Sequence, residues 1–441
     1  MRGSGAFRTS IVPGGALAGP WVANSLWKNA RAVPSLDLRF AENKSLTDAT
    51  TGASLVTFTR ASTGTFVGSD GVLRSATTNE ARFDHNPTTG ESLGLLVEEA
   101  RTNLLLRSEE FDNASWLNLN TTESSNVAVA PNGTLTADKL IENSGAGFKS
   151  IDQVLAISAL TYTFSVYVKA VERSIVQLLW SGGASTNFAN FNLATGTVTA
   201  GTYTSATITP AGSDWFRLSI TSVLAAGTFS GIISLQTSAS ATRAASYTGN
   251  GTSGIYLWGA QLEAGASPTS YIPTTTATAT RAADVASITG SAFSSWYRQD
   301  EGTVFVEGGP TNPTLNKTQL LLSISDGSAN NRMYLGKKFD STTVAEFGVA
   351  SGGVGQAFIL TTPSSISNAR FAAGYKVNDF AVASSGGALA TDTSGSVPVS
   401  STQLLIGTLD TGSNNINGHL RRLTFWPVRL PNTTLQAITQ P

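Results

Sequence analysis

The stretch TYTFSVYVK (161–169) alternates large apolar and small polar side chains at almost every second residue. Successive side chains of a strand point to opposite faces, so Phe164 and Val166 would share one face of an extended segment. DWFRLSI (214–220) and TFSGIISL (228–235) repeat this alternation. Such runs at short spacing, separated by turns rich in Gly, Ser and Asn, indicate antiparallel sheets packed as a sandwich.

Length and composition extend this interpretation to the whole chain. A chain of 441 residues is expected to form two or three domains, each with its own core. Charged residues make up 13% of the chain, about half the usual share, and the 43 glycines suit tight turns. We therefore predict an all-β protein with two antiparallel β-sandwich (jelly-roll) domains preceded by an extended N-terminal arm.

Charge and residue usage exclude several classes of function. The net charge is −1, and no basic run is long enough to neutralise several phosphates, which argues against nucleic-acid binding. No apolar run reaches the roughly 18 residues of a membrane span, so we expect no membrane insertion. The chain has no cysteine, which rules out disulfides, thiolate metal sites and cysteine nucleophiles.

Changes in pattern divide the chain into four parts. The predicted parts are an N-terminal anchoring arm (1–34), a strand block (35–104), a second strand-rich segment (105–275) and a third (276–441). The arm is rich in Gly, Pro and Ala, and its two large side chains are Trp21 and Trp27. Exposed indoles are unfavourable unless something covers them, so these tryptophans are expected to anchor the arm on a partner.

The most charged stretch is LGLLVEEARTNLLLRSEEF (93–111). If it is extended, the adjacent Glu98 and Glu99 point to opposite faces and cannot act together on one substrate. Arg101 follows two residues later, and Arg60 and Arg281 stand in the two Thr-Arg-Ala stretches that border strand blocks. We interpret these five residues as a structural ion-pair lock rather than a catalytic pair.

Enzymatic chemistry finds little support in the sequence. His85 and His419 are the only histidines, and neither accompanies a nucleophile-elbow motif. The loops SDGSANN (325–331) and LDTGSNNING (409–418) collect side-chain oxygens, but neither fits the calcium-binding EF-hand pattern. We therefore expect hairpin turns at both places, with loop-bound calcium as the competing interpretation, and we predict no catalytic residue, no metal and no cofactor.

Sugar binding requires aromatic faces and planar amides. In the segment 105–275 these residue types gather around the strand that ends in SIVQLLWSGG and the turn that follows it. The candidate carbohydrate-binding residues are Trp180, Asn187, Asn190, Tyr203 and Trp215. A structural role for the same residues is the competing interpretation.

Three blocks carry a resemblance to a known class of protein. GLLVEEARTNLLLRSEEFDNASW (94–116), SGIYLWGAQLEAGASPTSYIPTT (253–275) and GHLRRLTFWPVRLPN (418–432) resemble virion proteins of tailed bacteriophages, of the tail-fibre, spike or head-fibre type. YTFSVYVKA (162–170) is similar to strands of jelly-roll carbohydrate-binding modules, and NGHLRRLTFW (417–426) to concanavalin or laminin-G-type sandwiches. The resemblance implies that 105–275 is inserted between 35–104 and 276–441, which would then pack together.

The resemblance also implies a function. It predicts a non-enzymatic structural virion protein, made in the cytoplasm of a bacterial host and exposed on the particle. Residues 1–34 would contact other virion proteins, at least one sandwich would contact a host cell-surface glycan, and the chain would be a homotrimer. The alternatives are a capsid decoration or baseplate cement protein without glycan binding, and a glycan depolymerase, which needs two carboxylates about 5–10 Å apart.

Overall fold

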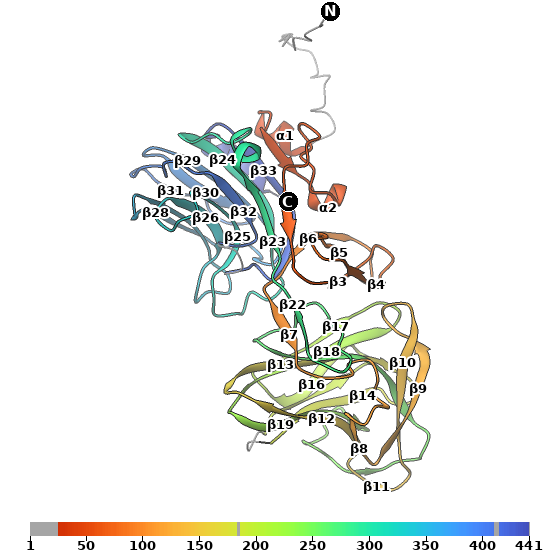
Figure 1. Cartoon of the computed structure of the whole chain (residues 1–441). Helices are drawn as coiled ribbons and strands as arrows, with labels where there is room; N and C mark the ends of the chain where they lie inside the picture. The colour runs from red at the N-terminus through yellow and green to blue at the C-terminus, as the bar shows by residue number, and fades with distance from the viewer. Residues whose placement is uncertain (1–24, 183–185, 410–413, 441) are drawn as a thin grey trace, which may run out of the picture.

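The computed structural model describes residues 25–182, 186–409 and 414–440 (Figure 1). Within these ranges nearly all regular structure is β-strand, and the named strands pair antiparallel. Two lobes follow one another along the long axis of the molecule, each built from two large sheets (Figure 1). This confirms the predicted all-β class and the two antiparallel sandwiches.

The lobe that holds the end of the chain, here called the C-terminal sandwich, has an eight-stranded sheet within the described residues. Strand β1 (Leu36–Leu38) pairs with one end of β33 (Gly418–Trp426), and β6 (Ser92–Val97) pairs with the other end of β33. In spatial order the remaining strands are β31 (Ala390–Asp392), β30 (Phe380–Ser384), β29 (Ala369–Lys376), β24 (Glu301–Pro310), β33 (Gly418–Trp426), β6 (Ser92–Val97) and β5 (Phe83–His85).

The second sheet of this sandwich has seven strands in the described part of the chain. Its strands, in spatial order, are β2 (Thr57–Thr59), β23 (Val285–Thr289), β32 (Gln403–Ile406), β25 (Gln319–Ser325), β26 (Arg332–Lys337), β27 (Ala345–Ser351) and β28 (Val354–Thr361). A single core of side chains such as Val97, Phe347 and Phe425 fills the space between the two sheets. Strands from 35–104 and from 276–441 therefore lie in the same two sheets.

The other lobe, here called the module, is formed by residues 105–275. One sheet runs β17 (Ser205–Pro210), β18 (Trp215–Leu224), β13 (Leu160–Ala170), β21 (Gly254–Ala264), β10 (Leu135–Glu142) and β9 (Thr121–Val129). The other runs β16 (Thr197–Thr202), β15 (Phe188–Asn192), β14 (Ile175–Ser181), β19 (Gly227–Gln236), β12 (Ser150–Ile157) and β8 (Leu117–Leu119). Phe164 and Val166, on the face predicted from alternation, are fully buried between these sheets.

Shorter elements complete the described chain. Two further two-stranded ribbons are β3 (Gly64–Val67) with β4 (Leu73–Ala76), and β11 (Ala146–Gly147) with β20 (Tyr247–Thr248). The helices are α1 (Ser25–Ala30), α2 (Phe40–Asn43), α3 (Gly290–Ser294) and α4 (Asn432–Thr439). None of these helices has the length and apolar character to cross a bilayer.

The N-terminal segment departs from the extended arm predicted for residues 1–34. Its described part forms helix α1, and Leu26, Trp27 and Ala30 of this helix are buried beside α4. The Trp27 indole also donates a hydrogen bond of 3.0 Å to the buried Asp37 carboxylate. Trp27 is thus covered by its own chain, which corrects its prediction as an anchor on a partner, while Trp21 lies outside the described residues.

Candidate functional site at the junction of the two sandwiches

Two strands carry the chain between the lobes. β7 (Arg101–Asn103) leads into the module and β22 (Ala279–Arg281) leads out of it, and the two pair antiparallel with Arg281 opposite Arg101 (Figure 1). The two crossings therefore form one hydrogen-bonded ribbon. The charged stretch predicted to form a lock lies at the start of this ribbon.

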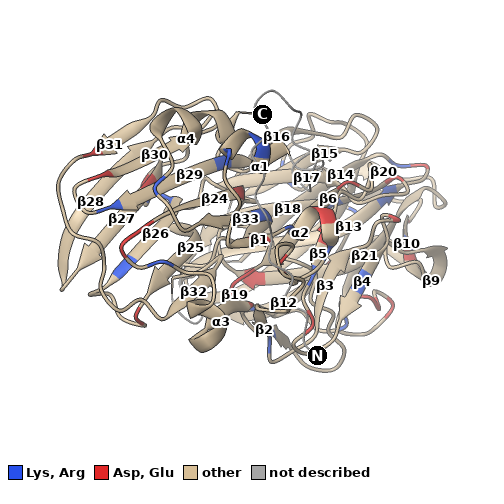
Figure 2. Cartoon of the chain, turned by 90° about the horizontal axis from the view of Figure 1, so that it is seen from above, with Lys and Arg blue, Asp and Glu red and all other residues tan. Residues whose placement is uncertain are grey.

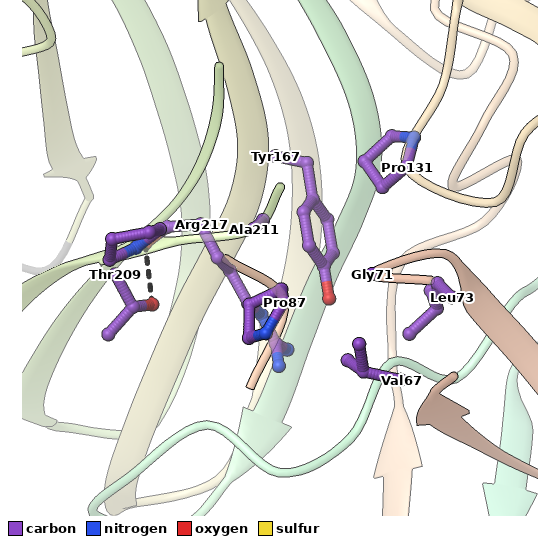
Figure 3. A pocket seen from close by; sticks show the side chains of 10 residues that line it. Val67, Gly71, Leu73, Pro87, Pro131, Tyr167, Thr209, Ala211 and Arg217 are labelled. Carbon is purple, nitrogen blue, oxygen red and sulfur yellow. Dashed lines mark hydrogen bonds between the residues drawn. The ribbon is translucent and has the colours of Figure 1, made fainter. Parts of the chain in front are cut away.

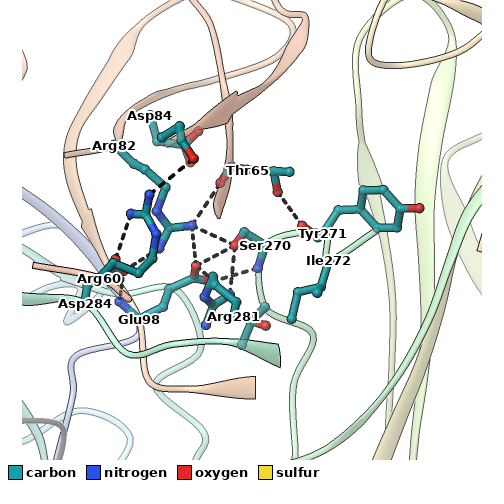
Figure 4. A network of polar contacts seen from close by, with 12 residues as sticks. Arg60, Thr65, Arg82, Asp84, Glu98, Ser270, Tyr271, Ile272, Arg281 and Asp284 are labelled. Carbon is teal, nitrogen blue, oxygen red and sulfur yellow. Dashed lines mark hydrogen bonds and ion pairs between the residues drawn. The ribbon is translucent and has the colours of Figure 1, made fainter. Parts of the chain in front are cut away.

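Glu98 is the centre of a buried polar network at this crossing (Figure 4). Its Oε2 lies 2.8 Å from Nη1 of Arg82 and 3.0 Å from Nη1 of Arg281. Ser270 donates to the same carboxylate twice, from its backbone N–H at 2.8 Å and from its hydroxyl at 2.7 Å. Glu98 and Arg82 belong to the C-terminal sandwich and Ser270 to the segment that leaves the module, so this carboxylate ties the two lobes together.

Asp284 is the second carboxylate of the network. It pairs with Nη1 of Arg60 at 3.1 Å and with Nη2 of Arg82, and it accepts the backbone N–H of Glu98 at 2.9 Å. The arginine side chains of the network are almost wholly buried, with 1% of Arg60 and none of Arg82 exposed. Arg82 thus bridges the two carboxylates (Figure 4).

Glu99 points away from Glu98, as expected for adjacent residues in an extended segment. Its carboxylate pairs with Arg101, with Nζ of Lys317 at 2.5 Å, and with the side-chain amide of Asn417 at 2.8 Å. The structure therefore places all five predicted lock residues at the junction, in two adjoining clusters. The sequence did not predict the part that Arg82, Ser270, Asp284 and Lys317 play, because their proximity depends on long-range folding, although Asp284 stands only three residues after Arg281.

The charges of the network shift the titration of its carboxyls. Burial by itself would raise the pKa of Glu98, but the Arg281 and Arg82 guanidinium groups and the Ser270 hydrogen bonds together hold it well below its usual range. For Glu99, burial is likewise outweighed by Arg101 and Lys317, so its pKa is also lowered. Both groups are therefore held as carboxylates at neutral pH, which suits an ion-pair lock and not a general acid.

An apolar cluster adjoins the ionic network through Tyr271, the neighbour of Ser270. Tyr167, Trp258 and Tyr271 form a buried aromatic cluster with Leu73 from the β3–β4 ribbon. The ring centroids of Trp258 and Tyr271 lie 4.8 Å apart, and those of Tyr167 and Trp258 lie 5.4 Å apart. The ribbon of one lobe thus packs on a sheet of the other, and burial of these rings adds to the ionic contacts.

A small cavity of about 100 Å³ remains beside this cluster (Figure 3). Val67 and Pro87 line it from the C-terminal sandwich, and Tyr167 and Arg217 line it from the module. The Arg217 guanidinium lies 5.4 Å from the centroid of the Tyr167 ring and donates to the Thr269 carbonyl at 2.6 Å. A cavity of this size has room for a few waters and is below the roughly 300 Å³ of small-molecule sites.

A polar groove of about 340 Å³ lies on the C-terminal sandwich beside α2. Its lining includes Arg39, Glu91, Arg421 and Arg422, while most of the ribbon elsewhere carries neither charge colour in Figure 2. Arg421 pairs with Glu91 at 2.8 Å, and both Arg39 and Arg422 pair with the buried Asp37 at 2.7 Å. These charges neutralise one another, and they hold β1 against β33.

The sugar-binding prediction is wrong for the two tryptophans. Trp180 is fully buried in the module core with its ring 6.0 Å from that of Phe164, because it shares the inward face of β14 with Val176. Trp215 is 2% exposed and belongs to the aromatic cluster of Tyr167, Trp258 and Tyr271. Its indole donates a hydrogen bond of 3.1 Å to the Val129 carbonyl. Neither indole offers a face to a ligand.

Of the remaining sugar-binding candidates, one is buried and two are at least partly exposed. Asn190 is buried and bonds to Gln177 and to the Ala241 carbonyl, so it has a structural role. Tyr203 is 40% exposed, and Asn187 is partly exposed. Phe188 pairs with Thr202 at the end of the β15–β16 ladder, so Asn187 and Tyr203, one residue beyond each, stand at the same end of that pair.

The remaining polar candidates from the sequence serve local structure. Nδ1 of His85 bonds to the Val67 carbonyl at 3.0 Å, and Nε2 of His419 lies 2.8 Å from the Asp84 carboxylate, so neither ring contacts a serine hydroxyl in the described chain. Asp326 closes its own turn by accepting the Ser328 N–H at 2.8 Å. The loop 409–418 lies partly outside the described residues.

Comparison with known proteins finds distant structural likeness. No family model matches the chain, and no curated protein matches it. The CBM40 domain of a Ruminococcus gnavus IT-sialidase, solved with α2,3-sialyllactose, is similar over 33% of this chain and 84% of its own length, with 15% identity and a TM-score of 0.28. Domains LG4–5 of the mouse laminin α1 chain are similar over 64% of this chain and 85% of their own length, with 12% identity and a TM-score of 0.21. Scores this low carry no inference about ligand or activity.

Proposed function

We propose that this chain is a non-enzymatic surface protein of a tailed phage or phage-like particle, which holds a glycan-binding module away from its site of attachment. One observation carries the proposal. The two sandwiches are joined end to end by a buried ion network and an aromatic cluster, so that they form a rigid unit and not two tethered domains. A rigid spacer of this kind suits a protein that presents one end to another surface.

The two ends of this unit differ. Helix α1 docks beside α4 on the C-terminal sandwich, at the end of the molecule remote from the module (Figure 1). Attachment through residues 1–24, which precede α1, would leave the module pointing outward. This arrangement agrees with the resemblance of 94–116, 253–275 and 418–432 to phage fibre and spike proteins.

The module is the lobe assigned to the host surface. Tyr203 and Asn187 stand together at one end of the β15–β16 ladder, and they supply an aromatic ring and a planar amide, the groups that sugars prefer. One such site binds weakly. Homotrimeric presentation, which the resemblance implies, would raise the avidity of weak sites without any new contact.

Binding of the chain to bacterial cells tests this proposal. The fluorescently labelled chain, presented on beads, is titrated against a panel of bacterial strains and their purified surface polysaccharides. Saturable binding to at least one is expected, with a loss of about fivefold or more in Tyr203→Ala, roughly 1 kcal/mol. Val223→Ala is the matched control, because Val223 is a 69% exposed residue of β18.

Two results would contradict the proposal. Absence of saturable binding by the folded, bead-presented chain would favour the decoration or cement role, in which the particle is the only partner. New reducing ends in the polysaccharide after incubation would show glycan cleavage and would overturn the non-enzymatic assignment.

A further inference from the structure

The outer face of strands β26–β28 carries an exposed aromatic row. Tyr334 on β26 stands opposite Gly348 on β27, which in turn stands opposite Phe358 on β28. Phe358 is 62% exposed and Tyr334 is partly exposed. Phe58 and Phe347 of the same sheet are buried, whereas these two rings reach the surface, which indicates a contact surface.

Glycines beneath the two rings allow them to lie down on the sheet. A Cβ atom at Gly348 would lie 2.3 Å from Cζ of Tyr334, and one at Gly355 would lie 2.5 Å from Cε2 of Phe358. Each ring therefore occupies the space that a side chain would take at its glycine. The result is a low platform of two rings, here called the Tyr334–Phe358 platform.

Two charged side chains of opposite sign, Glu346 and Arg332, contact Tyr334. At one end Glu346 accepts a hydrogen bond from the Tyr334 hydroxyl. The Arg332 guanidinium lies over the Tyr334 ring, 5.4 Å from its centroid. Because Glu346 stands opposite Gly336, four residues along β26 from Arg332, the two charged residues are separated by about 13 Å along the strands.

Arg332 has no ion-pair partner among the described residues. Its Nε is buried without a hydrogen-bond acceptor, and no described carboxylate forms an ion pair with it. The Arg332 guanidinium therefore lies at a partly exposed ring without a carboxylate partner in the described chain. The chemistry that complements this end is a carboxylate attached to a ring with an apolar face.

We propose that the Tyr334–Phe358 platform is a second carbohydrate site, specific for acidic polysaccharides whose sugar rings carry carboxylates. The apolar faces of the sugars would stack on Tyr334 and Phe358, the sugar carboxylate would pair with Arg332, and a sugar hydroxyl would donate to Glu346. The site lies on the C-terminal sandwich and does not involve Tyr203 or Asn187.

A second copy of the chain is a poorer fit to the same surface. β28 is the last strand of its sheet, and pairing through its edge would need free backbone groups. That edge is approached by a neighbouring segment of the same chain, in which the Ser396 N–H donates to the Gln356 side chain at 2.9 Å. The charges of Arg332 and Glu346 at Tyr334 also favour a polar ligand.

Binding of defined polysaccharides to the full chain tests the site. The probes are polygalacturonate oligosaccharides as the acidic ligand and dextran oligosaccharides as the neutral one, measured by calorimetry at two salt concentrations. We expect saturable polygalacturonate binding that weakens with salt, and dextran binding at least tenfold weaker. Arg332→Gln should reduce polygalacturonate affinity about tenfold and remove most of the salt dependence.

Gly348→Ala provides a second, independent variant. The added methyl would meet Cζ, Cε1 and the hydroxyl at the outer end of Tyr334, so we expect the ring to tilt while the fold is retained. We expect a loss of about fivefold or more in polygalacturonate affinity, with an unchanged melting temperature. Val223→Ala, in the module, should bind as the unmodified chain does.

Several results would overturn the second site. These are no saturable binding of polygalacturonate, equal affinity in Arg332→Gln, or self-association that Phe358→Ala abolishes in sedimentation, which would identify the platform as an interface between copies. The variants distinguish a failure of this second site from a failure of the proposed module site. Tyr203→Ala should leave polygalacturonate binding intact, and Arg332→Gln should leave the module's cell binding intact.

Discussion

The Glu98 carboxylate lies 3.0 Å from the Arg281 guanidinium, across the strands through which the chain enters and leaves the module. Glu98 lies between β6 and β7, the strand that leads into the module, and Arg281 ends β22, the strand that leads out of it. Closing this pair therefore requires the inserted module to fold with its two ends together. The contact makes the junction depend on both lobes at once.

Removing the charge of Glu98 should destabilise the junction strongly. Glu98→Gln keeps the shape of the side chain but leaves Arg82 and Arg281 with less compensation in a buried site, and we expect a loss of about 3–5 kcal/mol in the free energy of unfolding. Urea denaturation followed by fluorescence measures this loss. The control is Glu91→Gln, whose carboxylate is 61% exposed and should contribute less than about 1 kcal/mol. Equal effects of the two variants would contradict a lock.

The depressed pKa of Glu98 and of Glu99 gives the lock a pH dependence. Because the unfolded chain binds a proton at these sites near pH 4.3, roughly the ordinary glutamate value, while the folded chain does not, their contribution is complete above about pH 5 and declines as the pH falls below it. The unfolding free energy should therefore fall between pH 5 and pH 3. In Glu98→Gln this slope should be smaller, and an identical slope would argue that Glu98 is not held as a carboxylate.

Loss of the Trp27 side chain should destabilise the C-terminal sandwich. The indole is buried between α1 and the sheet and bonds to Asp37, so Trp27→Ala should reduce the free energy of unfolding by about 3–5 kcal/mol. Thermal unfolding of the purified chain measures the change. An effect below about 0.5 kcal/mol would instead restore Trp27 as a residue free to anchor on a partner.

Truncating Leu73 tests the apolar half of the junction. Leu73 packs with Tyr167 and Trp258 across the lobes, and Leu73→Ala should lower the unfolding free energy by about 2–4 kcal/mol. Limited proteolysis at the junction should also become faster. Leu160→Ala is the matched control, since Leu160 is 51% exposed on the module and should change the stability little.

Patterns within one strand predicted much of this structure. The alternation around Phe164 and Val166 identified the core face of β13, because strand periodicity is local. The same reasoning separated Glu98 from Glu99. The prediction failed at Trp180 because the position beside a turn was given more weight than the alternation with Val176 and Leu178, which places the indole on the inward face.

Features that depend on the register between strands could not be predicted from the sequence. Tyr334, Gly348 and Phe358 come together only because β26, β27 and β28 pair in one register, and no one of the three strands shows the row. Arg82 and Asp284 meet for a similar reason, since one precedes the inserted module and the other follows it. The prediction for Trp27 was wrong because α1 packs against α4, which lies at the opposite end of the chain.

The most direct test of the central claim is binding of the bead-presented full chain to bacterial surface polysaccharides, compared with Tyr203→Ala and Val223→Ala. The account predicts saturable binding that Tyr203→Ala weakens about fivefold or more and that Val223→Ala leaves unchanged. Failure of the folded chain to bind any polysaccharide of the panel would contradict the claim that this rigid pair of sandwiches presents a glycan-binding surface.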